Sequence, residues 1–293
     1  MNSSNKTPKV IVIIVNWQRP DDTIECLNSV FSSDYENFEV VLVDNGSQDD
    51  SVNRIHQAFP DINILEIPAN LGFTGGYNAG IEFARKIRAS YYFLLNNDTV
   101  IDKYAIRFLA SSGWDVSIPK ITYYGSPELI WSAGARWRAF PPTIKMIGYR
   151  KEDNPIYNRP YPLEYATGCA LMIREHVFEI VSGFDPVYQN YMEDYEFSYQ
   201  VRAAGFQMGY VPEALIQHKE SQTLGINSPQ RWQLLGRNTV IFYRKSTRFP
   251  GYTLWSVMGW IILREIVQGN LKYLPSFWQG VQEGWNIVKR INQ

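Results

Sequence analysis

The sequence predicts an α/β fold with a mostly parallel central sheet, and two observations support this prediction. Apolar runs alternate with helix-like segments between residues 10 and 100, which is the pattern of a parallel sheet covered by helices on both faces. Three of the runs end in unusual polar clusters, VNWQRPDD, VDNGSQDD and LNNDT. Because ligands bind at the carboxyl ends of the strands in such sheets, these clusters indicate a binding site.

Four strands and three helices are expected in the first hundred residues. The strands are VIVIIV, FEVVLV, NILEI and YYFLL, and the helices cover residues 21–32, 50–59 and 77–86. Before the third helix, NLGFTGGYNAG contains four glycines, and we expect a loop whose backbone approaches a diphosphate at the helix N-terminus. Its spacing matches neither GxGxxG nor GxxxxGK, so neither a dinucleotide-binding fold nor a P-loop is indicated.

The second half of the chain has a less regular pattern. Residues 115–162 are rich in Pro, Gly, Trp, Tyr and Arg, which favours long loops and short antiparallel strands, and loops of such length are often functional. A strand, CALMI, a helix, MEDYEFSYQVRAAG, and a further strand within YVPEALIQHKES follow. From residue 229 on, apolar and basic residues recur with helical periodicity and predict amphipathic helices.

The composition excludes several classes of protein. With 28 Lys and Arg against 29 Asp and Glu, the chain has no overall positive field that would hold nucleic acid. Cys26 and Cys169 lie far apart and lack the spacing of a metal site, which favours buried, reduced thiols in a cytoplasmic protein. The apolar stretch TLWSVMGWIIL is shorter than the ~20 residues that span a bilayer, so no membrane crossing is expected.

Asp98 follows the buried strand YYFLL, with Asn96 two residues before it. Its oxygens suit a hard divalent cation, but an aspartate in this position can equally cap a following helix. His218 also ends a predicted strand, which sets it apart from His56 and His176, for which a structural role is expected. The sequence leaves both a metal site and a helix cap open for Asp98.

Three other carboxylates also have two interpretations each. Asp44 ends a strand and precedes the turn NGS, where it can accept hydrogen bonds from a nucleoside or form an Asx-turn. Glu193 and Asp194 begin a helix after the aromatic stretch VYQNYM. A carboxylate among aromatic side chains can serve as a general base, and the alternative is that the pair complements the helix dipole.

Seven motifs, in this order, resemble those of family 2 glycosyltransferases with the GT-A fold: VNWQRP, VDNGSQD, NLGFTGGYNAG, LLNNDT, GCALMIR, GFDPVYQNYMEDYEFSYQVRAAGF and HKES. The similarity is greatest to rhamnosyltransferases that build bacterial surface polysaccharides, and it covers about residues 10–245. It implies a donor-binding half over residues 1–115, an acceptor-binding and catalytic half over residues 116–228, and a C-terminal helical segment over residues 229–293.

The resemblance also implies a role for each candidate residue. Asp44 corresponds to the acid that contacts the nucleotide base, and Asp98 to the last residue of an Asp-x-Asp metal motif whose first position is Asn96 here. His218 corresponds to a histidine that completes a site for Mg²⁺ or Mn²⁺. Asp194 corresponds to the catalytic base, with Glu193 as the alternate. The nucleotide-sugar site is implied to contain Asn16, Asp44, Asn45, Gly75, Gly76, Asn78, Asn96 and Asn97.

Enzymes of this kind transfer a sugar with inversion from a nucleoside diphosphate donor, such as dTDP-rhamnose, to a saccharide or lipid-linked saccharide, as in O-antigen synthesis. The base removes the proton of the acceptor hydroxyl, while the metal and backbone amides stabilise the departing diphosphate. Two alternatives remain, a metal-dependent hydrolase of nucleotide sugars and a non-catalytic nucleotide-sugar-binding or scaffold protein, because both would use the same side chains.

The C-terminal segment interleaves tryptophans with cations. Amphipathic helices of this composition suit a membrane interface, and peripheral contact with the cytoplasmic face of the inner membrane is expected. The alternative is that the tryptophans pack on the core or on a second subunit, which would make the protein an oligomer. The residues are Trp232, Trp255, Trp260, Trp278, Trp285, Arg237, Arg244, Lys245, Arg248, Arg264, Lys272, Lys289 and Arg290.

Overall fold

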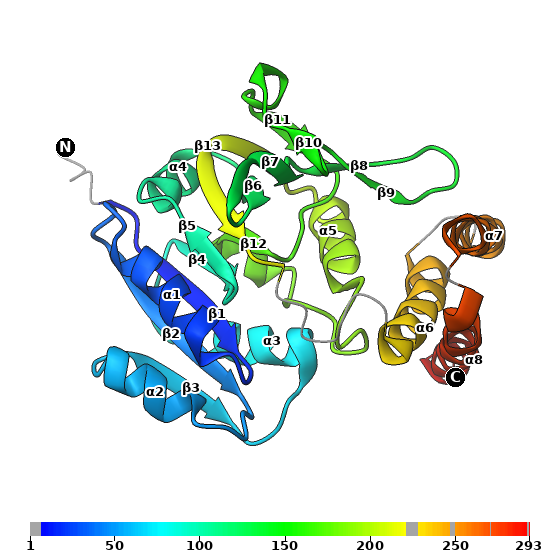
Figure 1. The fold of residues 1–293 in the computed structure, drawn as a ribbon, viewed down its shortest axis with the longest axis horizontal. Helices are drawn as coiled ribbons and strands as arrows, with labels where there is room; N and C mark the ends of the chain where they lie inside the picture. The colour runs from blue at the N-terminus through cyan, green and yellow to red at the C-terminus, as the bar shows by residue number, and fades with distance from the viewer. Residues whose placement is uncertain (1–6, 221–227, 247–249, 270, 292) are drawn as a thin grey trace.

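The computed structural model of the protein describes residues 7–220, 228–246, 250–269, 271–291 and 293. Ser221, the last residue of the motif HKES, and Arg248, one of the C-terminal cations named above, lie outside this part of the chain. The described chain forms one large mixed sheet with helices on both of its faces and a group of three helices at the C-terminal end (Figure 1).

The first half of the sheet is parallel, as the sequence predicts. Its strands lie in the order β4-β1-β2-β3, and a helix follows each of the first three strands. The strands are β1 (Val10–Asn16), β2 (Phe38–Asn45), β3 (Asn63–Ile67) and β4 (Tyr91–Asn96), and the helices are α1 (Pro20–Phe31), α2 (Ser51–Ala58) and α3 (Gly72–Ala84).

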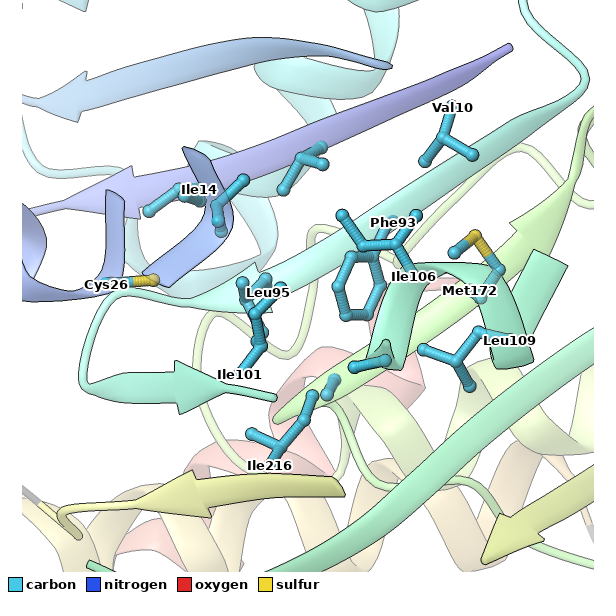
Figure 2. Packing of buried hydrophobic residues seen from close by; sticks show 14 of the residues in the cluster. Val10, Ile14, Cys26, Phe93, Leu95, Ile101, Ile106, Leu109, Met172 and Ile216 are labelled. Carbon is cyan, nitrogen blue, oxygen red and sulfur yellow. The ribbon is translucent and has the colours of Figure 1, made fainter. Parts of the chain in front are cut away.

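Both faces of β1, β2 and β4 are buried, because their side chains alternate between two apolar clusters, whereas β3 lies at the edge of the sheet and is only partly buried. Val10, Val12 and Ile14 of β1 pack with Cys26 of α1 and with Ile106, and Figure 2 shows this cluster from close by. Residues of the opposite parity on β1 and β2 join a second cluster under α3 and later elements. A strand with period-two alternation and two covered faces reads as a continuous apolar run, which explains VIVIIV.

The second half of the sheet is mixed. Strand β12 lies antiparallel to both β4 and β6, and β6 pairs in parallel with β13. Its strands are β5 (Thr99–Ile101), β6 (Val116–Tyr123), β7 (Ser126–Ser132), β10 (Lys151–Glu152), β11 (Tyr161–Leu163), β12 (Ala170–Arg174) and β13 (Met208–His218). Strands β8 (Ala135–Trp137) and β9 (Ile144–Met146) pair with each other in a separate two-stranded sheet. The helical elements are α4 (Ala105–Ser111), η1 (Pro155–Tyr157), η2 (Glu175–Glu179) and α5 (Glu193–Ala203).

The expectation for residues 115–162 was right about antiparallel strands and missed a central one. Strand β6 is buried over nearly its whole length, although its sequence, VSIPKITY, contains a proline and a lysine that argue against a central strand. Lys120 is buried and forms an ion pair of 2.8 Å with Asp153. This pairing compensates for the desolvation of the ammonium group and permits a lysine in the middle of the sheet.

The predicted glycine-rich loop is largely helical, which corrects the boundary expected from the sequence. Helix α3 begins at Gly72, so that Gly75 and Gly76 lie in its first turns. A Cβ atom on Gly76 would come within 2.8 Å of Val15, and one on Gly80 within 2.5 Å of Ile13. These two glycines allow α3 to lie close against β1, because any larger side chain at either position would overlap with the strand.

The C-terminal helices form an apolar cluster of their own. They are α6 (Pro229–Lys245), α7 (Pro250–Gln268) and α8 (Leu274–Ile291), with η3 (Leu271–Tyr273) before the last. Helices α6 and α8 cross closely, since a Cβ on Gly280 would lie 1.8 Å from the carbonyl oxygen of Gln233. Within the described residues, no helix is both long enough and apolar enough to span a bilayer.

Candidate active site

The strand register brings the predicted polar residues to one edge of the sheet. Asn16 lies opposite Asp44 on β2, and Val15 lies opposite Asn96 on β4. All three of these strands run in parallel, so their carboxyl ends meet at this edge. The polar residues that follow the three strands therefore lie close together, as the sequence predicts.

Asp44 is held by a fixed set of donors. Its Oδ1 accepts from the amide of Asn16 at 2.9 Å and from the hydroxyl of Ser47 at 2.6 Å, and its Oδ2 accepts from the backbone N–H of Ser47 at 2.9 Å. The turn expected as an alternative is thus present. A carboxylate offers about four acceptor positions, so these contacts leave an acceptor position on Oδ2 for a ligand N–H.

Asn16 and Asn97 belong to the same hydrogen-bond chain. The hydroxyl of Thr23 donates to Asn16 Oδ1 at 2.8 Å, and the amide of Asn97 donates to that hydroxyl at 2.9 Å. Asn16 is fully buried. The chain therefore ties β1, α1 and the end of β4 together and orients Asp44, and sequence reasoning missed Thr23 because a threonine inside an amphipathic helix carries no distinct signal.

Asn45 and Asn78 use their amides within the fold. Asn45 accepts from the N–H of Leu71 at 3.0 Å and donates to the carbonyl of Gly72 at 3.0 Å, which fixes the start of α3. Asn78 exchanges two hydrogen bonds with the backbone of Phe184, at 2.7 and 3.0 Å. It lines a hollow of about 740 Å³ in which none of the other predicted site residues takes part.

Asp98 does not cap a helix, because strand β5 follows it directly. Strand β5 pairs with β13 so that Thr99 lies opposite His218. This register places His218 Nε2 3.2 Å from Asp98 Oδ1, and both side chains are buried. Two residues 120 positions apart in the sequence are thus brought into contact by strand pairing.

The donor set of Asp98 and His218 fits a divalent cation. Two ligands bound at about 2.1–2.2 Å and at right angles stand roughly 3.0 Å apart, close to the observed 3.2 Å. His218 Nδ1 has no hydrogen-bond partner among the described atoms. Burial opposes protonation of the imidazole, but Cys169 and Asp98 outweigh burial and raise the pKa of His218 well above its usual value. Only a neutral imidazole binds a metal, so a cation at this site has to displace that proton.

The protein supplies only part of such a metal site. Asn96 Oδ1 accepts a hydrogen bond from the hydroxyl of Tyr77 at 3.1 Å, so the residue at the first position of the motif is engaged elsewhere. Among the described residues, no group of three or more His, Cys, Asp or Glu side chains is placed to hold a metal. Magnesium commonly takes one or two protein ligands and completes its shell with phosphates and water.

Glu193 and Asp194 occupy the first turn of α5 and differ in their surroundings. Asp194 accepts from the hydroxyl of Tyr165, from the N–H of Gly168 at 3.2 Å and from the N–H of Tyr195 at 3.0 Å. Asp194 is also partly exposed, whereas Glu193 is 7% exposed and its Oε2 has no partner among the described atoms. Asp194 is therefore the carboxylate that an acceptor can reach.

The protonation of this pair follows from the same contacts. Burial raises the pKa of Glu193 well above its usual value, and the neighbouring charge of Asp194 raises it further. Burial also raises the pKa of Asp194, but the hydrogen bonds from Tyr165, Gly168 and Tyr195 oppose this rise. Glu193 is thus the residue that keeps a proton, and Asp194 the residue that ionises first.

The segment before β12 connects Asp194 with the strand-end cluster. The N–H of Gly168 donates to Asp194, and the carbonyl of the next residue, Cys169, accepts from the N–H of Asn96 at 3.0 Å. Strand β12 begins beside the end of β4, with Ala170 opposite Leu95. Asp194 and Asn96, which lies two residues before Asp98, are therefore bound by the same stretch of backbone.

A residue of α6 that sequence reasoning missed holds the loop before α5. Asn238 is fully buried, and its amide donates to the carbonyls of Tyr188, Asn190 and Tyr191 at 2.7–3.0 Å. Tyr191 and Met192 have positive φ angles, a conformation that non-glycine residues adopt only where the surroundings impose it. An amide within the apolar run NTVIFY was the signal that could have found Asn238.

Comparisons with known proteins identify the family of the chain. The model of glycosyl transferase family 2 matches residues 11–180, and that of glycosyl transferase family 21 matches residues 156–278. The low-salt glycan biosynthesis hexosyltransferase Agl10 of Haloferax volcanii is 28% identical over 90% of this chain and 86% of its own length. The N-acetylglucosaminyl-diphospho-decaprenol L-rhamnosyltransferase of Mycobacterium tuberculosis is 27% identical over 80% of this chain and 84% of its own.

Two solved structures share the fold. GalNAc-T7 with UDP, GalNAc and Mn²⁺ superposes with a TM-score of 0.63 at 18% identity, over 83% of this chain and 49% of that one. The mannosyltransferase PcManGT from Pyrobaculum calidifontis, in complex with GDP-Man and Mn²⁺, gives a TM-score of 0.55 at 14% identity, over 94% and 74%. With the family model covering more than half of its residues, the chain belongs to glycosyl transferase family 2 and is a glycosyltransferase with the GT-A fold.

Proposed function

We propose that the protein transfers a hexose, of the rhamnose type, from a nucleoside diphosphate donor to a hydroxyl group of a lipid-linked saccharide in surface polysaccharide synthesis. The names of the Haloferax and Mycobacterium relatives support the sugar class and the acceptor class. The observation that carries the proposal is the placement of Asp194. Its carboxylate is partly exposed and accepts three hydrogen bonds. One of the donors is the N–H of Gly168, and the next residue, Cys169, accepts a hydrogen bond from Asn96 of the strand-end cluster.

The proposed reaction is a single displacement with inversion. Asp194 takes the proton of the acceptor hydroxyl while the hydroxyl oxygen forms a bond to the anomeric carbon. The bond between that carbon and the diphosphate oxygen breaks at the same time, and the nucleoside diphosphate leaves with the electron pair. Glu193, which keeps its proton, adds no negative charge beside the base.

In this proposal, different parts of the donor are bound by Asp44 and by the pair Asp98 and His218. Asp44 offers its remaining acceptor position to a donor N–H of the nucleotide base. Asp98 and His218 would hold Mg²⁺ or Mn²⁺, which stabilises the negative charge of the departing diphosphate when bound. The Mn²⁺ in the two structural neighbours supports the choice of metal.

Thermal unfolding with a panel of nucleotide sugars, with and without Mn²⁺, tests the donor part of the proposal. We expect one deoxyhexose donor to raise the Tm in a metal-dependent way, since a ligand at about 100 times its Kd stabilises by roughly 2.7 kcal/mol. Product analysis with that donor then separates the alternatives. Sugar released without an acceptor would indicate a hydrolase, and binding without turnover under any acceptor would indicate a scaffold protein.

Tyr165→Phe should move the pH dependence of transfer. The Tyr165 hydroxyl lowers the pKa of Asp194, so its removal raises that pKa. The base must be ionised to accept a proton, and the acidic limb of the kcat/KM profile is therefore expected to shift to higher pH, with activity recovering at alkaline pH. Tyr199→Phe, at an exposed position of helix α5, which also contains Asp194, is the matched control. An unshifted limb in Tyr165→Phe would contradict the assignment of Asp194 as the base.

A further inference from the structure

Helix α7 presents an apolar face to solvent. Its exposed residues in the described part of the chain are Tyr252, Trp255, Gly259, Leu263, Ile266 and Val267, and none of them is charged. At about 100° per residue these positions fall within an arc of roughly 120°. We call this set the outer stripe of α7.

The opposite side of α7 is already packed. Leu254, Val257, Met258 and Ile261 join the apolar cluster of the C-terminal helices. The helix is therefore apolar on both sides, whereas a surface helix of a soluble protein is polar on the side that faces water. The outer stripe contains large side chains at high exposure, with Tyr252 at 68%, Leu263 at 60% and Val267 at 79%.

The stripe continues onto neighbouring elements. Phe140, between β8 and β9, is 64% exposed, and its ring centre lies 6.3 Å from that of Tyr252. Leu271 of η3 and Trp278 of α8 are exposed as well. Figure 1 shows α7 at the edge of the molecule, beyond α6, with the β8–β9 connection reaching toward it. An exposed apolar surface of this kind marks an interaction site.

Charge distinguishes between the occupants of such a surface. Residues 229–293 contain nine Lys and Arg against two Asp and Glu, a net charge of +7, whereas the whole chain carries −1. The remaining residues therefore carry −8. A second copy of the chain would bring one +7 segment against another, and an anionic surface would attract this segment while repelling the rest of the protein.

Cations also lie at the border of the stripe. Trp260, which is partly buried, has the guanidinium groups of Arg138 and Arg264 over its ring, at 5.5 and 5.0 Å from the ring centre. Lys272 follows Leu271 and is exposed. Aromatic rings and cations beside an apolar face are the arrangement of a helix that lies in a lipid–water interface.

We propose that the outer stripe of α7, with Phe140, Leu271 and Trp278, inserts into the surface of an anionic phospholipid bilayer, with α7 in the plane of the interface. This contact follows from exposure and charge alone and does not depend on the proposed sugar transfer. Its consequence for the enzyme is that the C-terminal helices face the membrane while the negatively charged remainder points away from it.

Cosedimentation with vesicles tests the proposal without donor or acceptor. The full chain is expected to bind vesicles of phosphatidylcholine with ~30% phosphatidylglycerol more tightly than pure phosphatidylcholine, and to bind less at high salt because screening weakens the attraction. Leu263→Glu/Val267→Glu should weaken binding at least tenfold. Ile156→Glu/Ile180→Glu, two exposed apolar positions outside the C-terminal segment, makes the same charge change and should retain binding.

Three results would overturn the proposal. The first is that the unmodified chain does not bind vesicles. The second is that the two double variants lose vesicle binding equally. The third is that the chain binds no vesicles but forms a dimer in solution, which only the α7 substitutions convert to a monomer. Equal Tm values of the variants and the unmodified chain show that the substitutions leave the fold intact. Donor-induced stabilisation, measured in the same samples, reports on the proposed function separately.

Discussion

Asp194→Asn is expected to lower kcat by about 10²–10⁴-fold while leaving donor binding intact, because a general base contributes on this order to a proton transfer. The amide oxygen can still accept from Tyr165 and Gly168, which share one carboxylate oxygen in the native protein, and only the hydrogen bond from the N–H of Tyr195 to the other oxygen is lost. The variant should therefore fold normally and lose only the ability to take up a proton. Steady-state kinetics together with the donor-induced rise in Tm measures both quantities.

Glu193→Gln is the control for this prediction. Glu193 is buried, and its raised pKa keeps it protonated, so that a neutral isostere should preserve most of the turnover. The opposite pattern, with Glu193→Gln inactive and Asp194→Asn active, would transfer the role of base to Glu193. Loss of turnover in both variants with unchanged Tm would show that the two carboxylates act as a unit.

Asp98→Ala is expected to abolish the part of donor stabilisation that depends on Mn²⁺ and to lower kcat/KM on the order of 10²-fold or more, since it removes charge stabilisation of the leaving group. The variant removes one of the two side chains that we propose as metal ligands, whose atoms lie 3.2 Å apart. A titration with Mn²⁺ in the presence of the donor is the direct measurement, because it reports on the metal site independently of turnover.

Two further variants make this test sharp. Asp98→Asn keeps the shape of the side chain and removes its charge, so it separates loss of metal from loss of packing at a position that is 8% exposed. Asp61→Ala, at an exposed turn, should change neither the metal titration nor activity. A normal Mn²⁺ response in both Asp98 variants would exclude Asp98 as a ligand.

The alternation of apolar runs with helix-like segments was sufficient to predict the parallel half of the sheet. Strands buried on both faces, such as VIVIIV and YYFLL, produce uninterrupted apolar runs, and parallel pairing then forces their carboxyl ends to one edge. The convergence of Asn16, Asp44 and Asn96 is a consequence of this topology. Strand β6 escaped prediction because its buried Lys120 depends on Asp153, a partner that the local pattern cannot indicate.

Other features were decided by contacts between distant segments. The sequence left Asp98 as metal ligand or helix cap, and the pairing of β5 with β13 excluded the cap and supplied His218. The resemblance implied Asp194 as the base with Glu193 as the alternate, and the structure gives the two side chains different surroundings, because Asp194 is partly exposed and accepts hydrogen bonds from Tyr165 and Gly168.

The sequence by itself determined the fold class and the edge of the sheet at which the polar residues gather, because periodicity records which side of each element is buried, and its seven ordered motifs carried the family resemblance. Tertiary structure alone decided that Gly76 and Gly80 serve close packing against β1, that Asn238 holds the loop before Asp194, and that the outer stripe of α7 faces outward. The physical reason is that a buried apolar face and an exposed one have the same composition, and only the neighbours contributed by the rest of the chain distinguish them.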